Sequence, residues 1–273
     1  MSRVPKYMGG FTLIEAVMVI VITGILGALV SSFATPLKGY FDATARADLS
    51  DVADTALRRM ARDVRLALPN SVRVNTSGGD FYLDFLATTG GGRYRAVVDS
   101  TGAGDPLDFS AADTSFDVLG STVDIAANDQ IVVYNLGVSG ADAYEGNTAA
   151  THVRRAASAV GAGLSSVSIT SSNRLPFDSP AHRFQIVHEQ VRYICDLATG
   201  RLTRYAGFTI ATPTATVPAD GSSALLASGV TACSFAYVPG VTQRASLITI
   251  SLTLSKSGES VTLLHQVHVQ NVP

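Results

Sequence analysis

Glu15 is a carboxylate in a stretch of the chain that otherwise carries no charge. Between Lys6 and Lys38 every other residue is uncharged, and most of them are apolar. On insertion scales a carboxylate inside a membrane segment costs a few kcal/mol, so such a residue normally has a cationic partner and a purpose. We therefore interpret Glu15 as a pairing residue and not as a catalytic acid.

The other residue types that carry out chemistry do not form a catalytic pattern. His265 and His268 are three apart on an expected strand, which directs them to opposite faces, and the adjacent pair His188 and Glu189 fails as a metal site for the same reason. We find no HExxH zinc motif, nucleophile elbow or phosphate-binding loop, and the glycines at 90–92 are interpreted as a turn. We expect no enzymatic activity, no metal and no cofactor.

The composition limits the classes of partner. The chain has 273 residues, with 20 Lys and Arg against 22 Asp and Glu, and a formal net charge of −2. Nucleic-acid-binding proteins need a basic excess, so this balance argues against that class. Charged residues make up 15% of the chain, whereas a soluble domain usually carries about 25%.

The apolar residues gather in one segment near the N-terminus. Residues 11–33 form a helix of about 35 Å, which crosses a bilayer core with some tilt. Arg3 and Lys6 precede it, and positive flanks stay cytoplasmic, so the rest of the chain should face away from the cytoplasm. A cleaved secretory signal, with a small-x-small site at 32–34, and a plain membrane anchor are two alternatives. Neither explains Glu15.

A short motif surrounds the start of the apolar segment. It reads Gly9-Gly10-Phe11-Thr12-Leu13-Ile14-Glu15, after a short basic leader. The motif closely resembles the signature of type IV prepilins. The resemblance implies that a prepilin peptidase cuts between Gly10 and Phe11, and that the new amino group of Phe11 is then N-methylated. It also implies that Glu15 neutralises the Phe11 amine of a neighbouring subunit, which offsets the penalty of placing either charge alone in the membrane.

A second helical pattern follows the apolar segment. We expect a kink or short break at Pro36, where the helix leaves the membrane, and an amphipathic helix that ends at Pro69-Asn70. The apolar stripe should pack under the following domain, whereas the charges on the other faces, such as Asp54 and Asp63, are typical of a solvated surface. The stripe contains Leu49, Val52, Ala56, Met60 and Val64. The predicted organisation is a leader at 1–10, a transmembrane half-helix at 11–35, an amphipathic half-helix at 36–68 and a head at 69–273.

The head is predicted to be all-β. Short alternating runs rich in Val, Thr, Ser and Gly indicate antiparallel strands between turn-rich loops at 89–92, 139–148 and 209–223. Candidate strands are 81–87, 94–98, 130–136, 164–170, 182–196, 201–208 and 231–238. The clearest signal is a final hairpin that pairs 246–255 with 260–270 across Lys256-Ser257-Gly258. The expected fold class is α+β, a long N-terminal helix packed on an antiparallel β-rich head.

Two further candidate sites lie in the head. Cys195 and Cys233 fall in predicted strands of a domain that should face an oxidising compartment, so we expect a disulfide, with two buried free thiols as the alternative. The loop at 139–148 contains Asp142 and Glu145, which are too few carboxylates for a calcium-loop motif. Whether that loop holds a calcium ion through carbonyl groups stays open.

Three sequence stretches further along the chain narrow the resemblance to a subfamily. Residues 65–73, 191–195 with 200–204, and 266–273 resemble the O-type minor pilins of mannose-sensitive haemagglutinin (MSHA) pili, while 74–180 match no stretch of that family. The head is bulky for a subunit repeated along a thin fibre, which favours a scarce subunit at the pilus tip or in a priming complex.

The resemblance implies an inner-membrane protein with a periplasmic head, later found in the pilus at the cell surface. Its partners would be the prepilin peptidase, other minor pilins, the major pilin and the inner-membrane assembly platform. The alternatives are a minor pseudopilin of a type II secretion system and, from another class, a membrane-tethered β-rich adhesin or hydrolase.

Overall fold

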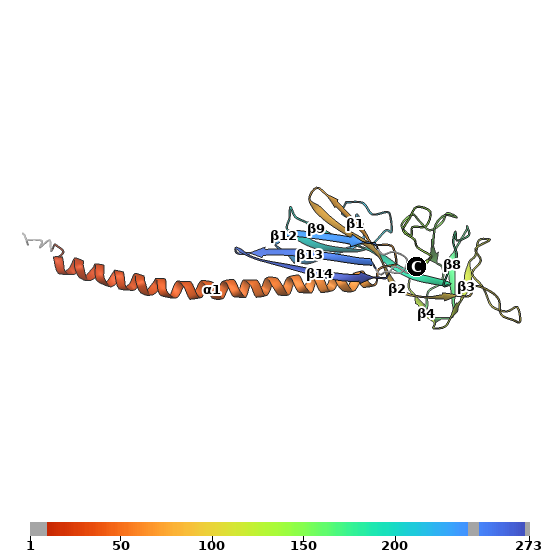
Figure 1. Ribbon diagram of the computed structural model, residues 1–273, viewed down its shortest axis with the longest axis horizontal. Helices are drawn as coiled ribbons and strands as arrows, with labels where there is room; N and C mark the ends of the chain where they lie inside the picture. The colour runs from red at the N-terminus through yellow and green to blue at the C-terminus, as the bar shows by residue number, and fades with distance from the viewer. Residues whose placement is uncertain (1–9, 240–245, 271–273) are drawn as a thin grey trace, which may run out of the picture. The chain divides into compact units, whose positions relative to one another are not determined.

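The computed structural model describes residues 10–239 and 246–270, apart from the side chains of 33–38. Residues 1–9 of the predicted leader and residues 271–273 of the C-terminal string lie outside this part. The chain divides into two compact units, one ending at Asp48 and the other beginning at Leu49. Figure 1 shows helix α1 and the strands. The elements are α1 (Leu13–Arg65), β1 (Arg73–Ser77), β2 (Asp80–Tyr94), β3 (Ser115–Leu119), β4 (Val123–Ile125), β5 (Gln130–Val133), β6 (Arg154–Ala157), β7 (Gly161–Leu164), β8 (Ser166–Thr170), β9 (Arg183–Asp196), β10 (Arg201–Phe208), β11 (Ser222–Ser228), β12 (Val230–Val238), β13 (Ser246–Lys256) and β14 (Glu259–Val269).

Helix α1 is continuous over 53 residues. The break expected at Pro36 is absent, because losing one backbone N–H does not end a helix whose turns on both sides are formed. The helix ends before the predicted residue 68, since the backbone that follows pairs with β2. Leu68 N–H donates to the carbonyl of Leu86 at 2.7 Å, and Thr88 N–H donates to the carbonyl of Leu66 at 2.8 Å.

The part of α1 that belongs to the second unit carries a buried apolar stripe. Of the predicted stripe, Val52 is 41% exposed, which contradicts the expectation. The buried face is centred further round the helix, because Ala53, Leu57 and Ala61 also enter the core. The predicted stripe residues that are buried are Leu49, Ala56, Met60 and Val64.

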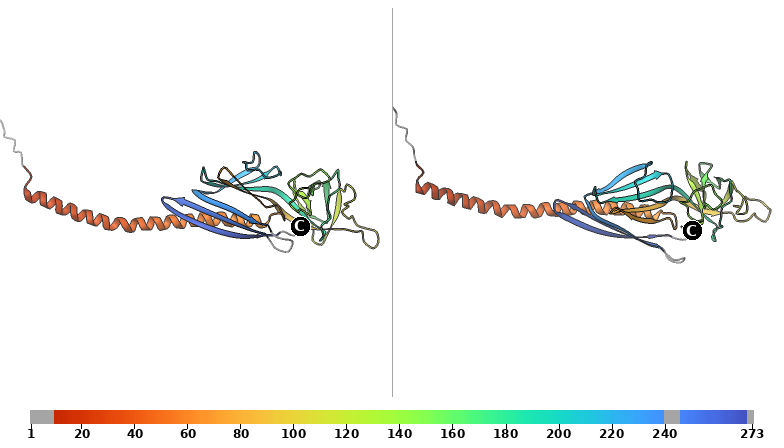
Figure 2. Two further views of the ribbon diagram at one scale, coloured as in Figure 1. Left: turned by 45° about the horizontal axis from the view of Figure 1, so that its top comes forward. Right: turned by 90° about the horizontal axis from the view of Figure 1, so that it is seen from above.

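Two sheets enclose this part of the helix. The first half of β2 and the second half of β9, which pair antiparallel, form one side together with β1, β10 and β11, and the three-stranded sheet β12-β13-β14 forms the other. In both views of Figure 2 the strands β13 and β14 run alongside α1. Helix residues such as Met60 share one hydrophobic core with Tyr193 of β9 and Ile250 of β13. The predicted packing of helix on sheet is therefore confirmed.

The predicted C-terminal hairpin is present. Strands β13 and β14 pair in register from Ser246 with Val269 to Lys256 with Glu259. Ser257 and Gly258 have φ of 54° and 87°, the left-handed pair that a two-residue type I′ turn requires. Lys256 is thus the last residue of its strand and not part of the turn.

The second half of β2 and the first half of β9 enter a small barrel. Pairings run β2–β3–β8–β6–β5–β9 and return from β9 to β2, so these strands form a closed ring. Its core contains Tyr94, Phe116 and Phe184, and the Phe116 and Phe184 rings meet edge to face with centroids 5.2 Å apart. Closure pairs the strands on both sides, which removes exposed edges from this part of the head.

The glycines at 90–92 lie inside β2 and do not form the predicted turn. Gly91 pairs with Gln185 and Gly92 with Phe184 of β9. A Cβ on Gly91 would lie 2.6 Å from the Phe184 carbonyl oxygen, so the glycines permit an approach that a side chain would block. The predicted strand at 94–98 is also wrong. After Tyr94 the backbone of Arg95 bonds with Asp117 and Leu107 instead of continuing along β9.

Candidate functional site

Gly10, Phe11 and Glu15 lie together at the N-terminal end of α1. Gly10 and Phe11 precede the helix, and the Phe11 side chain is 82% exposed. No described atom lies within 4 Å of the position that a Cβ on Gly10 would occupy. The space beside Gly10 is therefore open toward the described residues other than its chain neighbours.

Thr12 caps the helix, a role that the sequence analysis missed. Its Oγ1 accepts a hydrogen bond from Glu15 N–H at 3.3 Å, and its carbonyl accepts one from Ala16 N–H at 3.1 Å. Thr12 and Glu15 have the T-x-x-E spacing of a capping box, so the signal was present in the sequence. Glu15 lies in the first turn, where the helix dipole favours a negative charge. The motif thus starts the helix and places Glu15 in its first turn.

The segment that follows is suited to a bilayer. Leu13–Ser32 is 20 residues long, has a mean hydropathy of 2.6 and contains no residue that the chain buries. Its hydroxyl groups bond to the helix's own carbonyls, Thr23 Oγ1 to Val19 O at 2.6 Å and Ser31 Oγ to Ala28 O at 2.9 Å. Because lipid offers no hydrogen-bond partners, such internal satisfaction is what a spanning helix needs. By length and composition the segment is able to cross a membrane.

Residues 5–31 match the family model of the prokaryotic N-terminal methylation motif. The chain carries a prepilin-type methylation motif. The match contains Gly10, Phe11 and Glu15 and supports a type IV pilin-like family, with processing by a prepilin peptidase. No curated protein and no solved structure matches the chain.

The predicted disulfide is present in the head. Cys195 of β9 and Cys233 of β12 are bonded, with Cα atoms 6.7 Å apart, and both are buried. The bond joins the nine-stranded sheet to the three-stranded sheet. Such a disulfide agrees with a head that folds in an oxidising compartment.

Asp63 fastens α1 to the large sheet, although the sequence pattern assigned it to a solvated face. Its Oδ2 accepts hydrogen bonds from Tyr193 Oη and Arg204 Nε, each at 2.7 Å. Burial, and then the Asp63 carboxylate, raise the pKa of the Tyr193 phenol. Arg204 also donates to Glu189 at 3.1 Å. These four residues are brought together only by the fold, so no spacing in the sequence predicts their contact.

The residues considered for metal binding have protein partners. His188 Nδ1 lies 2.7 Å from Asp129 Oδ1. In the loop at 139–148, Asp142 pairs with Arg73 at 2.8 Å, and Glu145 accepts a backbone N–H of the same loop at 3.0 Å. Residues 10–239 and 246–270 contain no group of three or more His, Cys, Asp or Glu side chains placed to hold a metal ion.

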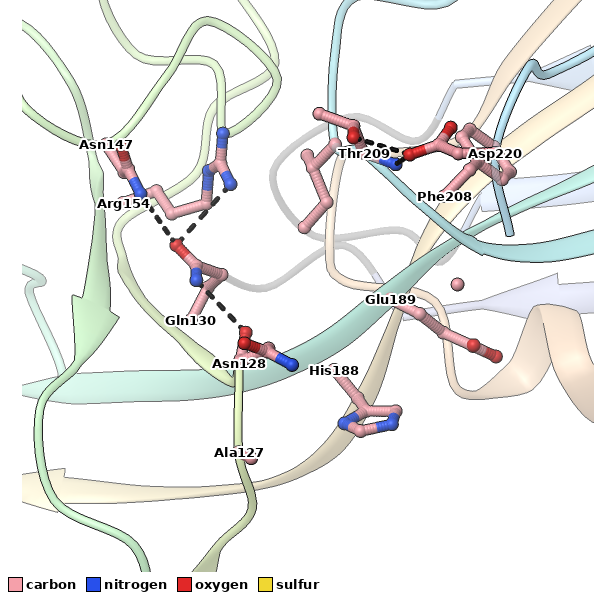
Figure 3. Close-up of a pocket in the computed structure, with 12 residues that line it drawn as sticks. Ala127, Asn128, Gln130, Asn147, Arg154, His188, Glu189, Phe208, Thr209 and Asp220 are labelled. Atoms are coloured by element: carbon pink, nitrogen blue, oxygen red, sulfur yellow. Dashed lines mark hydrogen bonds between the residues drawn. The ribbon is translucent and has the colours of Figure 1, made fainter. Parts of the chain in front are cut away.

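A cavity of about 490 Å³ opens in the head between the barrel and the loop after β10. Asn147, Arg154 and Gln130 lie on one side in Figure 3, and Thr209 and Asp220 lie on the other. Strand β9 passes between the two walls. The lining is Ala127, Asn128, Gln130, Asn147, Arg154, His188, Glu189, Gly207, Phe208, Thr209, Ile210 and Asp220. These residues are scattered along the sequence, which is why no motif predicted the cavity.

Arg154 of β6 is a buried cation in the wall of this cavity. Its side chain is part of a residue that is 6% exposed, and Nη1 donates to Gln130 Oε1 at 3.5 Å. Its Nε has no partner, and no carboxylate of the described residues forms an ion pair with it. Burial lowers the pKa of the guanidinium to about 10, which leaves it charged at neutral pH.

Proposed function

We propose that this chain is a minor pilin of an MSHA-type type IV pilus, active in assembly initiation or at the pilus tip. The observation that carries the proposal is the match of residues 5–31 to the methylation motif, at the start of a capped apolar helix in which no residue of the spanning segment is buried. The resemblance of 65–73, 191–195 with 200–204, and 266–273 to O-type MSHA minor pilins supports the finer assignment, as does the bulk of the head.

In this proposal the N-terminal residues have successive roles. The prepilin peptidase cuts between Gly10 and Phe11, and the Phe11 amine is methylated. Residues 11–35 hold the chain in the inner membrane, 36–68 carry the helix out of it, and the head at 69–273 folds in the periplasm. Glu15 then pairs with the Phe11 amine of a neighbouring minor or major pilin, so that two charges enter the apolar layer as a neutral pair.

Mass spectrometry of the mature N-terminus tests the processing step. The chain is purified from membranes of its native host and digested, and the first peptide is sequenced. We expect it to begin with N-methylated Phe11. A chain that begins at Ser2 or at Thr35 would refute the pilin assignment, because these ends belong to an uncleaved anchor and to a cleaved secretory signal.

Deletion of the gene separates a pilus from a secretion system. A minor pseudopilin of a type II secretion system would share every N-terminal feature, so the mature end does not distinguish them. We expect loss of surface pili with secretion intact. Loss of secretion with normal pili would favour the pseudopilin, and no effect on either would favour the tethered adhesin or hydrolase.

A further inference from the structure

Arg154 and Arg155 are neighbours on β6 with opposite environments. Successive side chains of a strand point to opposite faces, and Arg155 is fully buried on the other side. The guanidinium of Arg155 donates to five backbone carbonyls at 2.7–3.2 Å, those of Ala149, His152, Arg154, Asn173 and Arg174. The burial of Arg155 is therefore explained by a structural role, because its guanidinium holds the loops that carry these carbonyl groups. Arg154 has one long bond to a neutral amide and is not explained in this way.

A buried arginine without a counter-charge destabilises the fold unless something else is gained. Removing such a cation from water is costly, and a neutral amide at 3.5 Å returns little of that cost. Gln130 is itself held in place, because Asn147 Nδ2 donates to its Oε1 at 3.1 Å and its Nε2 donates to Asn128 O at 3.0 Å. Arg154 is thus held in one position at the wall of an open cavity, as a preformed anion-binding group would be.

The opposite wall of the cavity selects the kind of anion. Asp220 accepts hydrogen bonds from Thr209 N–H at 3.0 Å and Thr209 Oγ1 at 2.7 Å, both through Oδ2, so Oδ1 is left to accept from a ligand. Its negative charge opposes a multiply charged anion such as phosphate. It favours a ligand whose anionic end lies at Arg154 and whose other end donates hydrogen bonds. Phe208 and Ile210 add apolar surface, and Asn128 adds an amide.

We propose that this cavity binds a small carboxylate that also carries hydroxyl groups, the chemistry of an acidic sugar. The planar guanidinium of Arg154 receives the carboxylate, and Asp220 accepts sugar hydroxyls across the cavity. The volume lies in the range of small-ligand sites, about 300–1,000 Å³. Each part comes from the second compact unit, so the site does not depend on the N-terminal motif or on the pilin assignment.

Calorimetric titration of the full chain in a non-ionic detergent tests the ligand class. The probes are sodium glucuronate, glucose, acetate and inorganic phosphate. We expect glucuronate to bind at least about ten-fold more tightly than the other three, because each of them lacks the carboxylate, the hydroxyls or the single charge. Equal binding of acetate or phosphate would overturn the acidic-sugar class. Absence of glucuronate binding at concentrations up to about 10 mM would overturn the site.

Variants distinguish a binding role from a structural one. Arg154→Met keeps an unbranched side chain and removes the charge. We expect it to weaken glucuronate binding at least about ten-fold and to leave the melting temperature unchanged or raised, since an unpaired buried charge is lost. Arg174→Met removes an exposed arginine outside the cavity and should change neither value.

Asp220→Ala tests the opposite wall. It should weaken the binding of glucuronate and leave that of acetate unchanged, because acetate has no hydroxyl to donate. A lower melting temperature for Arg154→Met, or undiminished glucuronate binding by that variant, would overturn the proposal and assign Arg154 to the fold.

Discussion

Buried charges in the head generally have a partner of opposite sign within it. Arg192 Nε lies 2.7 Å from Asp84 Oδ1, with side chains 4% and 0% exposed, and Asp63 receives Arg204 at the same distance. Arg155 is buried without a carboxylate, but five backbone carbonyls accept hydrogen bonds from it. Arg154 has no such set of acceptors, and Glu15, which is exposed, forms no ion pair with a described residue. A charge that the fold leaves without a partner indicates contact with something outside the chain. For these two residues we propose a neighbouring subunit and a ligand.

Asp63→Asn should lower the free energy of unfolding of the head by about 2 kcal/mol. The variant removes the charge that holds Arg204 and Tyr193 against α1, while Arg204 keeps Glu189 and the site is partly exposed, so the loss is below that of a fully buried pair. Urea unfolding of the full chain in detergent measures it. Asp54→Asn is the matched control on the same helix, since its pair with Arg58 is exposed and is worth under about 0.5 kcal/mol. Equal effects of the two variants would contradict this role for Asp63.

Glu15→Ala should leave leader cleavage intact and reduce incorporation into pili. The peptide bond that is cut precedes the helix, whereas the lost carboxylate serves only the later pairing with a neighbour's amine. Immunoblots of membrane and sheared-pilus fractions measure both steps. Asp48→Ala, which removes an exposed acid of α1 outside the apolar segment, should assemble normally. Normal pilus incorporation of Glu15→Ala would show that the proposed pairing is wrong.

Elements with many residues in one regular pattern were predictable from the sequence. Helix α1, strand β9 and the β13–β14 hairpin have long periodic runs and clear turn residues. Short strands such as β4 and β7 were not predicted, because three or four residues carry no period and their pairing is decided by distant partners. The candidate site residues likewise fall into a group that the sequence predicts and a group that it does not. Gly10, Phe11 and Glu15 are adjacent in sequence, whereas the cavity around Arg154 is assembled from segments that only the fold brings together.

The glycines of β2 show how a local signal was misread. Glycine is common in turns, but register shifts between Ala87 and Gly90 mark the place where β2 passes from the helix-covering sheet into the barrel. A bulge with glycines gives a strand the bend that such a passage needs. Their role is to let two paired strands change direction together.

Gly91→Ala should destabilise the head by about 2 kcal/mol, because the added methyl would meet the Phe184 carbonyl at 2.6 Å and force the strands apart. Gly90→Ala is the neighbouring control. The nearest atom to its added methyl is Ile186 Cδ1 at 3.8 Å, an ordinary contact, so we expect a change within about 0.5 kcal/mol. Thermal unfolding monitored by near-ultraviolet circular dichroism compares them. A Gly91 variant as stable as the Gly90 variant would exclude close approach as the reason for the glycine.

At the scale of the whole molecule, one covalent bond connects the two sheets that enclose the helix. Cys195 and Cys233 are separated by 38 positions in the sequence. In the chain-entropy model a closed loop of this length restricts the unfolded state and stabilises the fold by roughly 4 kcal/mol. The bond therefore contributes as much as the burial of about two apolar side chains in the same core.

Reduction of the disulfide should lower the free energy of unfolding by roughly 4 kcal/mol. Urea unfolding with and without reductant measures the loss. The control is the double variant Cys195→Ala/Cys233→Ala, which should unfold near the reduced wild-type chain and show no response to reductant. A reductant effect on this double variant would mean that the loss does not come from the disulfide.

The helix that begins the core is covered by the strands that end the chain. Met60 and Val64 share their cluster with Ile250 and Val267, so these contacts join residues far apart in the sequence. Contacts of such separation form late, because a long loop must close first. During synthesis the face of α1 that packs on β13 and β14 stays uncovered until these strands have been made. A prematurely terminated chain never closes this core, so the order of the elements makes completion of the polypeptide a condition of folding and leaves unfinished chains exposed to proteolysis.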